Sequence, residues 1–359
     1  MADPRVEEYA RVLVETCVDV QPGWQVLVYC SPLARPLIEE TSRLIARRGA
    51  YALLRVSLDG EAMDLPWTAE ASEELLGKPA SIRIHELETA DALIAIIAPE
   101  NTRELTAVSP ERLGLLQAAY RPAMERMFTG DMPWVGCQYP THSLAQEAGM
   151  SFREFEDFLY GACLLDWAAE RDRMAGYAAR FDAADEVRIV GEETDLRLSL
   201  AGRNAEIDAG GANVPGGEFF YSPLEDSAEG SIAFTEFPAV YGGREVNGIR
   251  LRFEHGRVVD ASADSNEDFL LETLDLDEGA RRLGELGIGC NPGITRHMKN
   301  TLFDEKIDGT VHVALGNGIP VVGGTNVSKI HWDIVKDLRN GGRIELDGDV
   351  VQENGVWQI

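Results

Sequence analysis

The sequence lacks an apolar run long enough to cross a bilayer. Its most apolar stretch, residues 92–98, is far shorter than the roughly 18–20 residues that a membrane-spanning helix needs. The first residues, Met1-Ala2-Asp3-Pro4, have neither the basic start nor the apolar core of a secretory signal peptide. These absences predict a cytoplasmic protein without a membrane partner.

Positive charge is scarce throughout the chain. The 359 residues include 33 Lys and Arg against 61 Asp and Glu, for a formal net charge of −28. Nucleic acids and anionic lipid surfaces are bound through basic faces, so this balance argues against both as partners. Most of the acidic excess is expected to be a solvated surface, and a fraction of it could serve a cation site.

Paired cysteines and several common motifs are also missing. The five cysteines are odd in number and scattered without a CxxC pair, which predicts reduced thiols in a cytosolic protein. No GxGxxG or GxxxxGK[ST] sequence supports a nucleotide site, and no GxSxG sequence supports a serine hydrolase.

The N-terminal half alternates predicted strands with predicted helices. Strands are expected over residues 25–30, 51–58, 92–98 and 134–138, and helices over residues 36–48, from 110, and from 151. Apolar strands alternating with helices indicate a parallel sheet covered on both faces. The sequence therefore predicts an α/β domain with a parallel sheet over residues 1–183.

The pattern changes near residues 181–185. Residues 186–190 and 194–200 have strand character, the second with a clean alternation of apolar and polar side chains, and glycine-rich turns follow one another. Residues 184–359 are therefore predicted to form a sheet-rich α+β domain. Four of the six histidines lie in this half, the most informative of them close to carboxylates.

His331 and Asp333 form the sharpest candidate site. They lie in the apolar segment Ile330-His-Trp-Asp-Ile334, and positions i and i+2 of a strand face the same side. A histidine nitrogen beside a carboxylate oxygen is half of a divalent metal site. Taken alone, a structural His–Asp hydrogen bond explains the pair more simply.

Three further candidates stand in apolar, glycine-rich segments. His312 lies in a predicted strand that ends at Gly316, and Glu285 lies at the start of the apolar run to Gly289. Glu218 follows a Pro-Gly-Gly turn at the start of another strand. A buried, unpaired carboxylate is costly, so these acids are expected to have a partner. A lone histidine in such a strand is more often a satisfied core residue than a ligand.

Two histidines and three carboxylates suit a pair of divalent ions that share a carboxylate and a water. Such ions polarise a carbonyl and lower the pKa of the bridging water, which makes it a nucleophile near neutral pH. Nitrogen and oxygen ligands without cysteine point to two divalent metal ions, either Zn, Co or Mn.

The C-terminal half resembles the thermophilic metallo-aminopeptidases of the aminopeptidase T and aminopeptidase S type. The resemblance rests on five motifs in order: NVPGGE (213–218), EDSAEG (225–230), DEGARRLGE (277–285), DEKIDGTVH (304–312) and NVSKIHWD (326–333). The N-terminal half fits the α/β domain of that family more loosely.

The resemblance implies that Glu218, Glu285, His312, His331 and Asp333 are the metal ligands. It implies a homodimeric, metal-dependent aminopeptidase that hydrolyses N-terminal amino acids from short peptides through a metal-activated water. It further implies that Glu285 or Glu218 bridges the metals and helps to take a proton from that water.

The sequence departs from the family at one position. The family carries a tyrosine seven residues after the histidine that corresponds to His312, and this tyrosine is thought to assist catalysis. Ile319 stands at that position here. Loss of a hydrogen-bond donor to the transition state would impair peptide hydrolysis, and Tyr221 or Tyr241 is a candidate to replace it.

Two other functions are compatible with the same residues. The dihydroxypyridine dioxygenases resemble this family but use one Fe(II), held by two histidines and one carboxylate with positions open for oxygen. His331 and Asp333 with His312 or Glu285 could supply those ligands, which would make the substrate a small molecule. Alternatively, the chain could be a binding or scaffold protein without competent metals.

Overall fold

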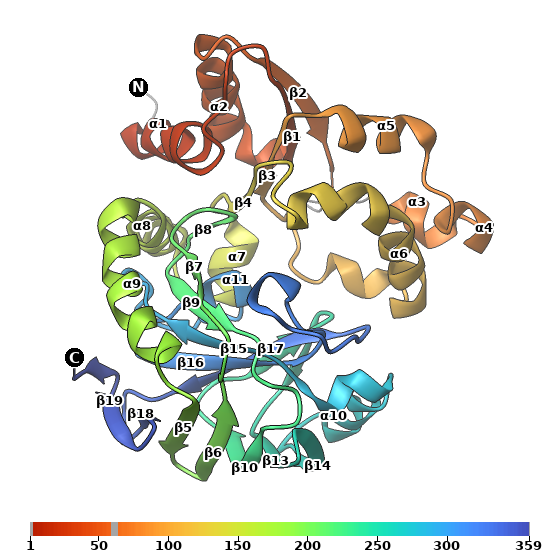
Figure 1. Cartoon of the computed structure of the whole chain (residues 1–359). Coiled ribbons are helices and arrows are strands. Elements are labelled where there is room, and N and C mark those ends of the chain that lie inside the picture. The colour runs from red at the N-terminus through yellow and green to blue at the C-terminus, as the bar shows by residue number, and fades with distance from the viewer. Residues whose placement is uncertain (1–2, 59–63, 359) are drawn as a thin grey trace. The chain divides into compact units, whose positions relative to one another are not determined.

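The computed structural model describes residues 3–58 and 64–358, which divide into two compact units (Figure 1). The first unit runs up to Leu165 and also takes in Gly210–Gly216. The second unit holds Asp166–Ala209 and the chain from Gly217 onwards. Among the helices of the described residues, none combines the length and the apolar character that crossing a bilayer requires.

The first unit is built on a parallel five-stranded sheet in the order β2-β1-β3-β4-β8. Its strands are β1 (Gln25–Cys30), β2 (Tyr51–Val56), β3 (Ala92–Ile97), β4 (Trp134–Gln138) and β8 (Asn213–Val214). The central residues Val26, Leu27 and Val28 are all fully buried, which is the pattern of a strand covered on both faces. The predicted parallel sheet is confirmed.

Helices accompany these strands along the chain. They are α1 (Pro4–Arg11), α2 (Arg35–Arg47), α3 (Leu65–Glu70), α4 (Glu73–Leu76), α5 (Ser81–Thr89), α6 (Pro110–Phe128), α7 (His142–Glu147) and α8 (Phe152–Cys163). The start of α8 is fixed by a capping box: the Ser151 hydroxyl accepts a hydrogen bond from the Glu154 N–H, and the Glu154 carboxylate accepts one from the Ser151 N–H.

The second unit is rich in antiparallel sheet, as the sequence predicts. An eight-stranded sheet has the order β14-β13-β10-β6-β5-β18-β19-β20. Its strands are β5 (Glu186–Gly191), β6 (Thr194–Ser199), β10 (Glu229–Phe234), β13 (Ile249–Glu254), β14 (Arg257–Ser262), β18 (Arg343–Leu346), β19 (Asp349–Glu353) and β20 (Val356–Trp357).

A separate five-stranded sheet, which we call the site sheet, has the order β17-β16-β15-β9-β7. Its strands are β7 (Glu206–Asp208), β9 (Glu218–Tyr221), β15 (Leu283–Gly289), β16 (Thr310–Gly316) and β17 (His331–Asp337). The two-stranded ribbon β11 (Ala239–Tyr241) and β12 (Arg244–Val246) and the helices α9 (Trp167–Asp182), α10 (Glu267–Leu274) and α11 (Thr301–Asp304) complete the unit.

Helix α9 lies at the start of the second unit. The predicted domain boundary falls at its end, between residues 183 and 184, whereas the compact units divide at its beginning. Side-chain packing explains this placement, because Phe181 packs edge to face on Phe219 of β9, with ring centroids 5.2 Å apart. The Tyr221 hydroxyl also donates a hydrogen bond to the Asp182 carboxylate.

Four of the five cysteines are buried, and none of the five forms a disulfide in the described residues.

Candidate metal centre

The site sheet carries all five residues that the sequence singles out. Glu218 is the first residue of β9, Glu285 lies on β15, His312 on β16, and both His331 and Asp333 on β17. These strands come from segments far apart along the chain, and Figure 1 shows β9, β15, β16 and β17 within the second unit.

Strand register aligns the carboxylates on one face. Glu285 pairs with Ala314 of β16, and Ala314 pairs with Asp333 of β17. The carboxylates of Glu285 and Asp333 therefore lie in one row across the sheet, with Ala314 between them. A register shift between Leu283 and Glu285 interrupts the β15–β16 pairing just before this row. Such bulges commonly re-aim a side chain next to a functional site.

Glycines lie opposite both histidines. His312 pairs with Gly287, and His331 pairs with Gly316. A Cβ atom added at Gly287 would lie 1.9 Å from Cε1 of the His312 ring, so only glycine leaves space for that imidazole. Gly287 thus makes room for His312 within the sheet.

The five side chains converge in two groups that share Glu285. Oε1 of Glu285 lies 3.4 Å from Nε2 of His312, and Oε2 lies 3.0 Å from Nε2 of His331. Ligand atoms of Glu218, Glu285 and His312 lie within 4.8 Å of one another, as do those of Glu285, His331 and Asp333. One carboxylate therefore presents one oxygen to each group.

Both imidazoles are oriented by backbone carbonyls. Nδ1 of His312 lies 3.0 Å from the Glu305 carbonyl oxygen, and Nδ1 of His331 lies 2.8 Å from that of Asn317. A proton on each Nδ1 satisfies these contacts and turns Nε2 towards the carboxylates, where Nε2 can bind a cation once it has lost its own proton. This is how metal-binding histidines are usually fixed.

Glu218 shows that the site suits a cation. Its side chain is buried, and its Oε1 atom lies 3.0 Å from the Lys306 ammonium. Its Oε2 atom accepts no hydrogen bond from the described residues and lies 3.6 Å from Nε2 of His312. A buried carboxylate oxygen without a donor is costly, and a bound cation would satisfy it.

In the protein without metal, protons balance these charges. Burial lowers the pKa of His312 and His331, but the neighbouring carboxylates outweigh it and raise them to about 10 and about 12. Burial raises the pKa of Glu218 to about 8. Burial also raises the pKa of Asp333, but the hydrogen bond from His331 and the nearby cations have the larger effect. The pKa of Asp333 is therefore lowered to about 2. A cation would replace the protons on the histidines.

Two residues that sequence reasoning missed also belong to this cluster. The Glu305 carboxylate lies within 4.8 Å of ligand atoms of His312 and Asp333. Lys306, fully buried, forms ion pairs with Glu218 and Glu305. The sequence does contain a signal for these two residues. Glu305 and Lys306 are adjacent just before the strand of His312, in a chain that has only five lysines.

The three acids after Glu218 do not join the cluster. Glu225 pairs with Arg203 and accepts hydrogen bonds from Thr325, while Asp226 pairs with Arg282. Glu229 lies 3.1 Å from the exposed His255 ring. They hold loops together rather than facing the histidines.

The two tyrosines considered as replacements for the family tyrosine lie differently. Tyr221 is fully buried and donates to Asp182, on the sheet face opposite Glu218. Tyr241 stacks on Trp332, with ring centroids 5.2 Å apart. Trp332 lies between the two β17 ligands, His331 and Asp333, in the sequence. Burial raises the pKa of Tyr241, and the charges of His331 and Asp333 also act on its hydroxyl. Tyr241 is the nearer of the two to His331 and Asp333, although Trp332, on which its ring stacks, leaves β17 on the opposite face from these ligands.

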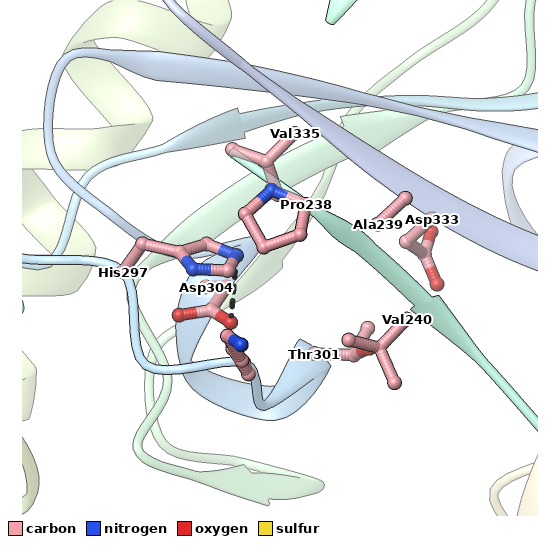
Figure 2. Close-up of a pocket in the computed structure, with 9 residues that line it drawn as sticks. Pro238, Ala239, Val240, His297, Thr301, Asp304, Asp333 and Val335 are labelled. Carbon is pink, nitrogen blue, oxygen red and sulfur yellow. Dashed lines mark ion pairs between the residues drawn. The ribbon is translucent and has the colours of Figure 1, made fainter. Parts of the chain in front are cut away.

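A hollow adjoins the cluster at Asp333. Its walls are Pro238, Ala239, Val240, His297, Lys299, Thr301, Asp304, Asp333 and Val335. Figure 2 shows the ion pair between His297 and Asp304 on one side of this hollow and Asp333 on the other. The hollow is small, about 20 Å³, so it has room for a water molecule beside a candidate ligand.

Known proteins share both the sequence pattern and the fold. The family model for thermophilic metalloproteases (M29) matches residues 2–357. The chain is 26% identical to aminopeptidase 2 of Geobacillus stearothermophilus over 369 residues, covering 92% of this chain and 88% of that protein. These matches extend through both compact units.

Two solved structures have the same fold. Wild-type AmpT from Thermus thermophilus matches with a TM-score of 0.84 and 24% identity over 99% of both chains. The 2,5-dihydroxypyridine dioxygenase from Pseudomonas putida KT2440 matches with a TM-score of 0.64 and 16% identity, over 98% of this chain and 96% of that one. At these identities the likeness shows the fold alone.

Proposed function

Since the chain belongs to the thermophilic metalloprotease (M29) family, we propose that it is an aminopeptidase that removes N-terminal amino acids from short peptides. Its named relative aminopeptidase 2 supports the choice of aminopeptidase within that family.

The proposed ligands are Glu218, Glu285, His312, His331 and Asp333, which would hold two divalent ions, either Zn, Co or Mn. The observation that carries this proposal is the position of Glu285, with one oxygen near each histidine in two overlapping groups of ligand atoms. Nitrogen and oxygen donors without sulfur suit these borderline metals.

When bound, such ions polarise a peptide carbonyl and lower the pKa of a water molecule. Glu285 is the proposed bridging carboxylate. Glu285 or Glu218 would help to take a proton from that water. Lys306 holds Oε1 of Glu218, which leaves its Oε2 atom to face the ion. Tyr241 is the candidate donor to the carbonyl oxygen in place of a tyrosine at position 319.

The test is metal content together with hydrolysis of amino-acid anilides and short peptides. The metal-loaded protein is expected to carry two Zn, Co or Mn ions per chain and to hydrolyse these substrates. Glu285→Gln is expected to lower metal content and to reduce kcat/KM by about a thousandfold or more, because it removes the shared charge. Glu225→Gln is the matched control, since this glutamate lies outside the cluster.

Full activity in Glu285→Gln would contradict the site. One bound iron and oxygen consumption with dihydroxypyridines would instead identify the ring-cleaving dioxygenase. Each group of ligand atoms found among the described residues pairs one histidine with two carboxylates, whereas the iron site calls for two histidines and one carboxylate. No metal uptake from excess metal would identify a scaffold protein.

The proposal includes a cytoplasmic location and a homodimeric state. The lack of disulfides among the described cysteines supports a reducing compartment, and the resemblance to the metallo-aminopeptidases supports the dimer. Light scattering of the purified protein measures the oligomeric state directly.

A further inference from the structure

Lys306 is a buried cation next to the candidate metal centre. Its side chain is 0% exposed, and its ammonium forms ion pairs with the carboxylates of Glu218, at 3.0 Å, and Glu305. A lysine is almost never fully buried unless it is paired. Here the pairing residues are part of the cluster that faces the histidines.

Among the five proposed ligands, Lys306 pairs with Glu218, while its other partner, Glu305, lies within 4.8 Å of ligand atoms of His312 and Asp333. On the Glu218 side, the ammonium is bonded to a proposed ligand. On the Asp333 side, the contacts are those that His331 makes with Glu285 and Asp333, at 3.0 Å and 3.5 Å. Because the negative charge of Glu305 borders both groups, the difference between them is the ammonium that is bonded directly to Glu218.

The two groups also differ in burial. Glu218, Glu285 and His312 are all at most 5% exposed. The His331 side chain is 34% exposed, so solvent reaches the Asp333 group directly.

We infer that Lys306 makes the two cation positions unequal, so that the Glu285–His331–Asp333 group binds its ion first and tightly while the Glu218–Glu285–His312 group binds second and weakly. This inference rests on the proposed metal centre. Lys306 is a positioning residue in this role, because it holds Oε1 of Glu218 and leaves Oε2 directed towards His312.

Electrostatics gives the direction of the effect. The buried ammonium is bonded to two carboxylates, those of Glu218 and Glu305, and this pairing keeps it charged. A positive charge on one ligand opposes a divalent ion at the same carboxylate, and the opposition is stronger in a buried site than in water.

Stepwise titration of the metal-stripped protein with Zn²⁺ or Co²⁺ tests the inference. Calorimetry is expected to resolve two binding steps whose Kd values differ by at least about tenfold, given a like charge in contact with one site. The Co²⁺ absorption spectrum reports each step independently of activity.

Substitutions identify which step belongs to which group. Glu218→Gln is expected to remove the weak step and keep the tight one, whereas Asp333→Asn is expected to remove or weaken the tight step. Lys306→Met is expected to strengthen the weak step by about tenfold or more, because it removes the opposing charge.

Lys336→Met is the matched control for the lysine. Lys336 is also 0% exposed and pairs with Glu236 at 2.6 Å, on the same strand as His331 and Asp333 but outside the ligand groups. Its removal is expected to cost stability and to leave both Kd values unchanged within about twofold.

The outcomes separate the inference from the proposed function. Two equal steps in the wild type, unchanged in Lys306→Met, would overturn the role of Lys306 and leave the metal centre standing. Absence of any binding, even with excess metal, would overturn the metal centre itself. If Lys306→Met does not fold, the comparison of Glu218→Gln with Asp333→Asn still decides: loss of the tight step in Glu218→Gln contradicts the assignment.

Discussion

Among single residues, the two histidines set the pH dependence of metal binding. Without metal, the pKa of His312 is raised to about 10 and that of His331 to about 12, so both imidazoles carry an extra proton at pH 7. A cation can bind Nε2 only after that proton leaves, so affinity is expected to rise with pH and to fall as pH is lowered.

Calorimetry at pH 7 in two buffers of different ionisation enthalpy counts the protons released. We expect between two and three protons per two ions bound, one from each imidazole and most of a third from Glu218, whose pKa burial raises to about 8. Binding without proton release would show that the histidines are already neutral in the protein stripped of metal.

Tyr241 is the residue on which catalytic efficiency is expected to depend most after the ligands. Tyr241→Phe is expected to lower kcat by about tenfold to a hundredfold with metal content unchanged, because a hydrogen-bond donor to the transition state is lost. Steady-state kinetics with an amino-acid anilide measures the change.

Tyr221→Phe is the control for this substitution. It removes a buried hydrogen bond to Asp182 and is expected to cost about 1 kcal/mol of stability without changing kcat. An equal loss of kcat in both variants would show that Tyr241 acts through stability alone.

At the level of residues, the sequence predicts which side chains share a face of a strand, because alternation along the strand decides it. His331 and Asp333, two positions apart, project from one face as predicted, with Nε2 and Oδ1 3.5 Å apart. Glu305 and Lys306 were missed because they precede a strand rather than lying within one, so no periodicity indicates which way they point. The contacts of Tyr241 depend on a two-stranded ribbon whose position the sequence does not reveal.

At the scale of elements, strand β15 is expected to tolerate change least. Gly287→Ala would place a methyl group 1.9 Å from the His312 ring and so displace that imidazole. We expect this variant to lose metal binding although no ligand has been removed, and metal analysis of the purified protein checks it.

Gly176→Ala provides the matched glycine substitution. A Cβ atom at Gly176 in α9 meets nothing within 4 Å, so alanine there is expected to raise stability by about 0.5–1 kcal/mol and to leave metal content intact. Unchanged metal content in Gly287→Ala would show that β15 shifts to accommodate the methyl group without displacing His312.

Most strands and helices could be predicted from the sequence, but the pairing of strands within the sheets could not. The predicted strand over residues 25–30 coincides with β1, because a short apolar run bounded by a turn has one simple interpretation. The order β17-β16-β15-β9-β7 joins strands separated by long stretches of chain, including other sheets and helices. Local patterns carry no information about such distant pairing, nor about the two-residue strand β8 that completes the parallel sheet.

For the whole molecule, metal removal is expected to affect the two units unequally. All proposed ligands lie in the second unit, and a ligand that binds only the folded state stabilises it by mass action. Hydrogen exchange after chelator treatment is expected to increase in β9, β15, β16 and β17 and to stay unchanged in β1 and β3. Equal increases in both units would show that they unfold as one cooperative body.

The chain crosses between the two units more than once, so the units cannot be separated by a single cut. Gly210–Gly216 leaves the second unit to supply β8 to the parallel sheet, and the chain returns at Gly217, directly before Glu218. A single cut at Leu165 would therefore strip the parallel sheet of an outer strand. On either side of this excursion, the Gly217 N–H donates to the Asp208 carbonyl at 2.7 Å, so the two ends already meet. An engineer who wants the ligand-bearing unit alone would begin at Asp166 and splice a tight turn in place of Gly210–Gly216.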